Sequence, residues 1–224
     1  MVNIHLNREV EKLKQLLLNQ SLLVEKALDK TLKSFLECDL DLTNQIIVED
    51  RKIDFREIEI EEECLKVLAL HQPVAGDLRY VMTCLKVNND LERVGDLCCN
   101  IACQCQEIIK HQSARNGCSK NLELMFSEAV QILNNSLESL VSADKELAIQ
   151  TLKNDDIIDN LYSKINKKVI EKIECKPEEV RYYLALETIA RHLERIGDYA
   201  TNICEDVIYM INGEICRHKN CHEK

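Results

Sequence analysis

The sequence carries one charged, glycine-interrupted segment twice. Residues 90–101 read DLERVGDLCCNI, and residues 192–203 read HLERIGDYATNI. The two segments align without gaps at an offset of 102 residues (90 to 192), and they share Leu-Glu-Arg, Gly-Asp and Asn-Ile in register. A repeat of this kind predicts two similar structural units within one chain.

Apolar residues around each copy recur at spacings of three and four, which is typical of a helix that buries one stripe against partner helices. The chain has only 5 Gly and 2 Pro and no Trp, a composition that favours long helices over turns and sheets. The stripe of the first copy consists of Cys84, Val87, Leu91, Val94, Cys98, Ile101, Cys105 and Ile108. The stripe of the second copy consists of Leu186, Ile189, Leu193, Ile196, Ala200, Ile203, Val207 and Met210.

The few turn signals divide the chain into six helical segments of roughly 25 to 35 residues each. Short breaks are expected at residues 38–41, 71–76, 142–144 and 175–177, and a longer polar stretch at 111–121. We therefore predict an all-α fold of two tandem three-helix bundles related by pseudo-twofold symmetry. The first bundle is assigned to residues 1–112, the second to residues 113–216, and a C-terminal tail to residues 217–224.

Charge and apolar patterning limit the functional classes. The formal net charge of -10 argues against a general nucleic-acid binder, because such proteins need a basic surface to neutralise phosphates. The charged N-terminal segment lacks the apolar core of a signal peptide, and no apolar run approaches the ~18 residues of a membrane-spanning helix. We expect a cytoplasmic protein whose 12 cysteines are mostly reduced and packed inside helical cores.

Each copy of the repeat places three polar residues, four apart, in one row on the face away from the apolar stripe. These rows are Glu92, Asp96 and Asn100 in the first copy, and Glu194, Asp198 and Asn202 in the second. Like charges at this spacing repel by a few tenths of a kcal/mol. Gly95 and Gly197 each cost about 1 kcal/mol relative to Ala inside a helix. A purely structural helix needs neither feature, so their duplication favours a binding role.

The helix expected before each repeated segment's helix supplies a second pair of acids, Asp50 and Asp54 in the first half and Asp155 and Asp159 in the second. Two adjacent helices would then present four carboxylates and an amide oxygen in each half. Oxygen ligands favour hard cations such as Mg²⁺, Ca²⁺, Mn²⁺ or ferric iron, and zinc is a further candidate. The alternative is a solvated acidic surface that binds no metal.

The same residues resemble the motifs of the PhoU family: LERVGDLCCNIA, LERIGDYATNICE, the segment PVAGDLR at 73–79, and the two aspartate pairs. The resemblance covers essentially the whole chain, with the motifs in the family's order in both halves. It implies two three-helix bundles whose E(D)xxxD motifs bind multinuclear iron or zinc clusters at the surface. Cys98-Cys99 and Cys103-x-Cys105 depart from the family pattern and leave the metal's identity open. The implied metal ligands are Asp50, Asp54, Glu92, Asp96, Asp155, Asp159, Glu194 and Asp198, to which Asn100 and Asn202 are added as candidate amide ligands.

The resemblance also implies a function. PhoU-like proteins are cytoplasmic regulators, not enzymes, which restrain a phosphate ABC transporter and help its sensor histidine kinase to repress phosphate-starvation genes. The expected partners are therefore the transporter ATPase and the kinase, with peripheral membrane association through them and a homodimer as a further candidate assembly. Two alternatives stay open: a metal-free helical scaffold whose acidic face binds basic surfaces, and an accessory protein for another phosphate carrier.

An enzyme of the di-iron carboxylate type is not expected. Such bundles use Glu-x-x-His on two helices that project inward, and no Glu-x-x-His occurs in this sequence. The Cys and His residues at 216–222 have no matching Cys/His pair elsewhere, so we expect a terminal tail there and not a zinc site.

Overall fold

The computed structural model describes residues 4–110 and 120–213, and the regular structure in these two ranges is entirely helical. This confirms the predicted all-α fold. The predicted boundary at 112/113 and the predicted tail at 217–224, including its Cys and His residues, lie outside the described residues. The first half consists of α1 (Ile4–Glu37), α2 (Leu40–His71) and α3 (Ala75–Lys110). The second half consists of α4 (Lys120–Ser142), α5 (Lys145–Lys153), α6 (Asp155–Cys175), the 3-10 helix η2 (Pro177–Glu179) and α7 (Val180–Asn212).

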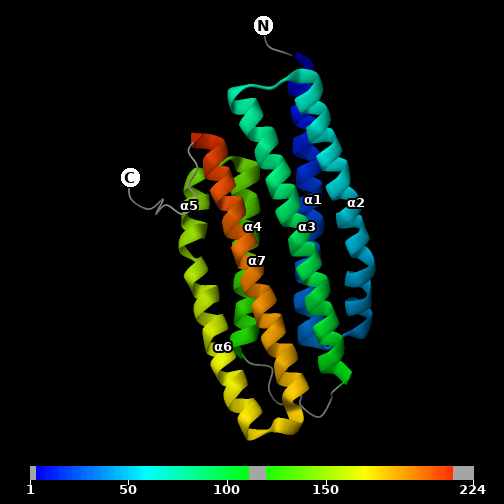
Figure 1. The fold of residues 1–224 in the computed structure, drawn as a ribbon, viewed down its shortest axis with the longest axis vertical. Helices are drawn as coiled ribbons and strands as arrows, with labels where there is room; N and C mark the ends of the chain where they lie inside the picture. The colour runs from blue at the N-terminus through cyan, green and yellow to red at the C-terminus, as the bar shows by residue number, and fades with distance from the viewer. Residues whose placement is uncertain (1–3, 111–119, 214–224) are drawn as a thin grey trace.

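The helices α3 and α7, which carry the repeated segments, pack side by side in the middle of the molecule and run in opposite directions (Figure 1). Arg79, near the start of α3, donates from Nε to the carbonyl oxygen of Met210 near the end of α7, at 3.2 Å. Lys86 Nζ of α3 lies 2.8 Å from Oδ1 of the buried Asp206 of α7. The remaining helices of each half flank this central pair (Figure 1).

The predicted apolar stripes form the core. Val87, Leu91 and Val94 of α3 and Ile189 and Leu193 of α7 have no exposed surface. Each fully buried aliphatic side chain of this size contributes about 1.5–3 kcal/mol relative to an exposed one. The two stripes join a single hydrophobic cluster that includes residues of α1, α2, α4, α5 and α6.

Matched aspartate caps begin the second helix of each half. Asp39 Oδ1 accepts hydrogen bonds from the backbone N–H groups of Asp41 and Leu42, at 2.8 and 3.1 Å. Asp144 caps α5 in the same way. An N-cap carboxylate satisfies backbone donors that have no partner inside the helix, so it fixes where the helix starts. The breaks predicted near residues 38–41 and 142–144 are thereby confirmed.

One predicted helix is divided in the structure. The long helix expected between residues 144 and 175 is two helices, α5 and α6, which meet at Asn154. The Asn154 N–H bonds to the Thr151 carbonyl at 3.1 Å, a tighter turn than an α-helix makes. Asn is a weak helix former, and the following Asp155 and Asp156 are favourable in a first helical turn, so the sequence supports a restart here.

Most of the described helices are long, with one apolar and one polar face. Among them, none combines the length and the apolar character that a transmembrane span requires.

The predicted packing of cysteines inside helical cores is confirmed for Cys64, Cys84, Cys98, Cys105 and Cys204, which are buried. Burial raises the pKa of the Cys64, Cys84, Cys98 and Cys204 thiols to about 12. The thiolate is the reactive form, so these groups are protected both by access and by protonation.

We expect iodoacetamide to modify the exposed Cys103 and Cys175 rapidly in the native protein. The five buried thiols should react only after denaturation, because the reagent cannot reach them. The raised pKa of Cys64, Cys84, Cys98 and Cys204 also keeps these four protonated. Peptide mapping by mass spectrometry measures each site separately. Rapid native labelling of Cys98 or Cys204 would contradict the assigned packing.

Candidate functional site

The four carboxylates predicted for the first half lie together on α2 and α3. Asp54 is exposed, whereas Asp50, Glu92 and Asp96 are half-buried. Burial raises the pKa of the Asp50 carboxyl, the charges of Asp54 and Asp96 raise it further, and a hydrogen bond with Cys99 opposes the rise. Since charges influence one another strongly only at short range, the structure brings the α2 pair and the α3 row into one cluster.

The second half repeats the cluster on α6 and α7. Burial raises the pKa of Asp155 to about 6, and four neighbouring carboxylates add to this rise: Asp159, Asp198, Asp156 and Glu194. Burial also raises the pKa of Glu194 and of Asp198, and the charge of Asp159 contributes to both. All four predicted acids of this half therefore act on one another.

The two glycines of the repeat allow this convergence. A Cβ built at Gly95 would lie 3.0 Å from Ile53 Cδ1 and 3.1 Å from Asp50 Oδ1, and one at Gly197 would lie 3.2 Å from Asp155 Oδ1. These separations are shorter than ordinary van der Waals contact, so a larger residue would push the aspartate away. The predicted close approach of the neighbouring helix is confirmed in both halves.

The two predicted amide ligands are less closely associated with the acids. Asn100 is exposed and Asn202 is half-buried. Within the described part of the chain, neither side chain hydrogen-bonds to a carboxylate of its cluster.

The donor set of each cluster fits a hard cation, because it consists of carboxylate oxygens that repel one another when no cation is present. As the side chains stand, however, no three His, Cys, Asp or Glu residues of the described ranges are arranged to hold a metal ion. Binding at either cluster therefore requires exposed carboxylates such as Asp54 and Asp159 to turn toward their partners.

Arginines partly neutralise both clusters. Arg93 Nε lies 3.4 Å from Glu92 Oε2, and its Nη1 lies 3.5 Å from Asp96 Oδ2. In the second half Arg195 partly offsets the rise in the pKa of Glu194. These contacts are open to solvent on the arginine side and are worth about 1 kcal/mol or less each, so they do not hold the carboxylates in fixed positions.

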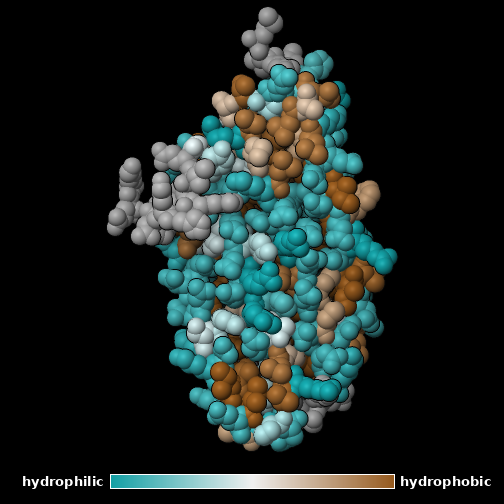
Figure 2. Space-filling model, viewed as in Figure 1, coloured by the Kyte–Doolittle hydropathy of each residue, from teal (hydrophilic) through white to brown (hydrophobic). Residues whose placement is uncertain are grey.

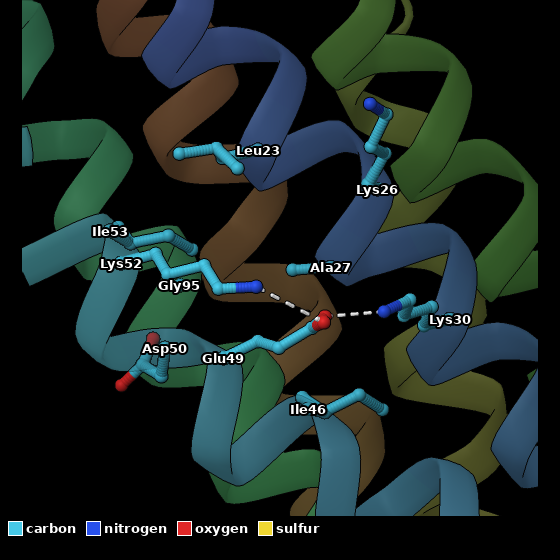
Figure 3. A pocket seen from close by; sticks show the side chains of 10 residues that line it. All are labelled: Leu23, Lys26, Ala27, Lys30, Ile46, Glu49, Asp50, Lys52, Ile53 and Gly95. Carbon is cyan, nitrogen blue, oxygen red and sulfur yellow. Dashed lines mark hydrogen bonds and ion pairs between the residues drawn. The ribbon is translucent and has the colours of Figure 1, made fainter.

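A pocket of about 220 Å³ lies between α1 and α2, beside the first cluster, and Asp50 and Gly95 contribute to its wall. Lys30 of α1 and Lys52 of α2 point at the Glu49 carboxylate from two sides (Figure 3). This cationic border is specific to the first half. At an offset of 105 residues (Asp50 to Asp155), the equivalents of Lys30, Glu49 and Lys52 are the uncharged Asn135, Asn154 and Ile157.

Two residues at the first cluster were not predicted from the sequence. Cys99 lies near Asp50 and donates from its thiol to the carbonyl oxygen of Ile46 at 3.9 Å. Burial, followed by the charge of Asp50, raises the pKa of this thiol. Glu57 adds a further negative charge near Glu92. Cys99 lies seven residues after Glu92, on the same helical face, so helical spacing alone could have identified it. Duplication could not, because the equivalent residues in the second half are Thr201 and Tyr162.

The sequence is similar to a known family. The family model described as "PhoU domain" matches residues 17–105 and 122–207. The "Phosphate-specific transport system accessory protein PhoU homolog 1" of Thermotoga maritima is 34% identical over 212 residues, which cover 95% of this chain and 91% of the relative. The "Phosphate-specific transport system accessory protein PhoU" of Escherichia coli is 28% identical over 212 residues, 95% of this chain and 87% of the relative.

The fold is similar to solved structures. The crystal structure of PhoU from Pseudomonas aeruginosa matches with a TM-score of 0.86 and 29% identity, over 93% of this chain and 99% of the other. The crystal structure of the phosphate transport system regulatory protein PhoU from Streptococcus pneumoniae matches with a TM-score of 0.85 and 28% identity, over 94% and 98% of the two chains.

The raised pKa of Asp155 makes a prediction about stability and pH. The pKa of Asp155 is about 6 in the folded protein, against 3.8 for an unperturbed aspartate, so ionisation of Asp155 opposes folding. This free-energy penalty is absent below pH 3.8 and complete above about pH 6. After allowance for solvent screening, we expect Asp155→Asn to stabilise the metal-free protein by about 1 kcal/mol more at pH 7.5 than at pH 4.

Urea unfolding in the presence of a chelator measures this difference, and Asp77→Asn, which changes an exposed carboxylate in the first turn of α3, provides the control variant. An equal effect of Asp155→Asn at both pH values would contradict the assigned burial and crowding of this carboxylate.

The close approach at Gly95 makes a second prediction. Gly76→Ala, where a Cβ meets nothing within 4 Å, should raise the free energy of unfolding by up to about 1 kcal/mol. Gly95→Ala gains the same helix propensity but crowds Ile53 and Asp50, so its net effect should be smaller or negative. Thermal unfolding of the two variants compares them directly, and equal stabilisation would show that α2 and α3 are not in close contact at this position.

Proposed function

This chain belongs to the PhoU family, and on that premise we propose that it is an accessory protein of a phosphate transport system that regulates phosphate uptake and phosphate signalling. Support comes from the names of relatives in Thermotoga maritima and Escherichia coli, each of which matches 95% of this chain. The main structural observation behind this proposal is the duplicated acidic cluster. Each half gives up stability to hold four carboxylates beside a helical glycine.

The proposed partners are the ATPase of a phosphate ABC transporter and its sensor histidine kinase, with the protein acting from the cytoplasm and reaching the membrane through them. An acidic face suits a basic or metal-bearing partner surface. No catalytic role is proposed, because both clusters lie at the surface, where water has access to any bound cation. Metal-assisted catalysis usually relies on a dry, shaped cavity.

We further propose that the two clusters bind metal ions, with iron or zinc as the first candidates and multinuclear occupancy allowed by four carboxylates in each half. The ligands would be Asp50, Asp54, Glu92 and Asp96 in the first half and Asp155, Asp159, Glu194 and Asp198 in the second. Asn100 and Asn202 are the candidate amide ligands, one in each half. A bound cation would neutralise the mutual repulsion of the acids and so would bind to the folded protein in preference to the unfolded chain.

The double variant Glu194→Ala/Asp198→Ala tests the metal proposal in the second half. We expect it to lose the metal bound by that half while its helices stay intact, since both side chains lie outside the apolar stripe. In metal-free buffer its stability should hold or rise by up to about 1 kcal/mol, because repulsion is relieved and Ala is the better helix former. Metal content by elemental analysis of untagged protein and circular dichroism provide the two readouts.

The matched control is Glu171→Ala/Glu174→Ala, which removes the same charge from exposed positions on α6. Unchanged metal content in the double variant would show that the ligands lie elsewhere. If metal is lost but cells carrying the variant regulate phosphate uptake normally, the cluster has a structural role and the acidic face acts without metal.

A further inference from the structure

A pocket of about 480 Å³ lies at the junction of the two halves, where α3 begins and α7 ends (Figure 1). Its walls are largely apolar and come from both halves. Leu17 of α1 and Leu140 of α4 are buried, and Met210 of α7 is half-buried. Small-molecule sites in proteins are typically apolar pockets of about 300–1,000 Å³ with a few polar groups. This pocket therefore has the size and the lining of a ligand site.

Charged side chains and one aromatic ring complete the lining of the pocket. Lys14 and Glu11 of α1 contribute to it from exposed positions. Lys14 Nζ lies 5.8 Å from the centre of the Tyr80 ring and 3.4 Å from Glu11 Oε2. A Cβ built at Gly76 would meet nothing within 4 Å, so the space beside the start of α3 is open. An apolar interior thus opens beside a cation whose ion pair is exposed and weak.

The chain forms this junction twice, because α1 and α4 occupy equivalent places in the two halves. Each helix is followed by a residue with positive φ, Cys38 at 54° and Ala143 at 51°. Next comes the aspartate that caps the following helix, Asp39 or Asp144. These matches align α1 with α4 at an offset of 105 residues (39 to 144). Because the pseudo-twofold relation exchanges the two helices, a contact between them has a counterpart at the other end.

Two aromatic rings fill the counterpart of the pocket. Phe35 of α1 and Phe126 of α4 pack with their ring centroids 5.1 Å apart and their planes tilted by 30°, and both are buried. At the offset of 105 residues (21 to 126, 35 to 140), Phe126 aligns with Ser21 and Phe35 aligns with Leu140. Both of these smaller residues line the pocket. The pocket therefore occupies the place of an aromatic pair.

The fold does not require this space to stay open. The Ser21 hydroxyl donates to the carbonyl oxygen of Leu17 in its own helix, at 3.0 Å, and such a bond is neutral to unfavourable for a helix. A space lined by apolar side chains also loses the dispersion contacts that neighbouring atoms would supply. The chain thus gives up packing at one of its two junctions, which favours a role in binding.

We propose that this pocket binds a small aromatic anion. The aromatic body would take the place that the paired rings hold at the other junction, beside the Tyr80 ring, and the anionic group would pair with Lys14. The bound molecule would contact both halves at once, so binding would stabilise their packing. The pocket shares no residue with the acidic clusters, and the proposal is independent of metal binding there.

Two dyes with the same ring skeleton test the site. Anilinonaphthalene sulfonate carries an anionic group, and N-phenylnaphthylamine lacks it. We expect the wild-type protein to bind one molecule of either dye per chain, saturably, with a rise in dye fluorescence and in the thermal stability of the protein. Ser21→Phe introduces the ring that the second half has at Phe126, so it should weaken the binding of both dyes at least about tenfold.

The charge of Lys14 is tested separately. Lys14→Met keeps an unbranched side chain at an exposed position and should leave the fold intact. It should weaken the binding of the sulfonate by about two- to fivefold, as expected for an exposed ion pair, and should not weaken the binding of the neutral dye. If circular dichroism shows that Ser21→Phe does not fold, this comparison of the two dyes decides the proposal.

An exposed apolar patch at the start of α3 supplies the control. Leu78 and Met82 are 39% and 38% exposed, and the patch to which they belong lies at the top of Figure 2. Met82→Gln makes this patch more polar at a position outside the pocket lining, so it should leave both affinities unchanged. The proposal is overturned if the wild type binds neither dye saturably or if Met82→Gln abolishes binding. It is also overturned if folded Ser21→Phe binds both dyes like the wild type, or if Lys14→Met does not distinguish between them.

Discussion

Burial of the apolar stripes of α3 and α7 is the interaction on which the other features of the structure depend. These two helices pack against each other between the halves, and each also covers the two flanking helical layers of its own bundle. At about 25 cal/mol per Å² of apolar surface removed from water, a core of this extent is the main favourable contribution to folding. Because one face of each helix is fixed in the core, the opposite polar row is fixed in direction as well.

That fixed direction explains how the protein tolerates crowded carboxylates. Repulsion between exposed like charges costs only tenths of a kcal/mol per pair, and a helical glycine costs about 1 kcal/mol, whereas each buried leucine or isoleucine of the stripe contributes about 1.5–3 kcal/mol. Asp155 shows where the compromise is greatest, since its pKa is raised to about 6 by burial and by its neighbours. A cation at the cluster would remove the electrostatic part of this cost.

The sequence alone was sufficient to predict the structural features that recur at a fixed spacing. The repeat at 90–101 and 192–203 predicted the two bundles, their stripes and the convergence of the acids, because periodicity and duplication both report on helix faces. Features of one half alone were not predicted. The restart at Asn154 depends on a balance between a weak helix former and the packing around it, and the contact of Cys99 with Asp50 depends on the distance between two helices.

The differences between the halves therefore carry as much information as the repeat. Both halves contain the helical glycine and the four acids, which argues that the two clusters have the same chemical role. Only the first half borders its cluster with Lys30, Glu49 and Lys52 and places an apolar stripe on its outer helix. The stripe formed by Val48, Phe55, Ile58 and Leu65 contributes nothing to the core, and the second half has Asn160 and Ser163 at two of the equivalent positions, so the fold itself does not require it.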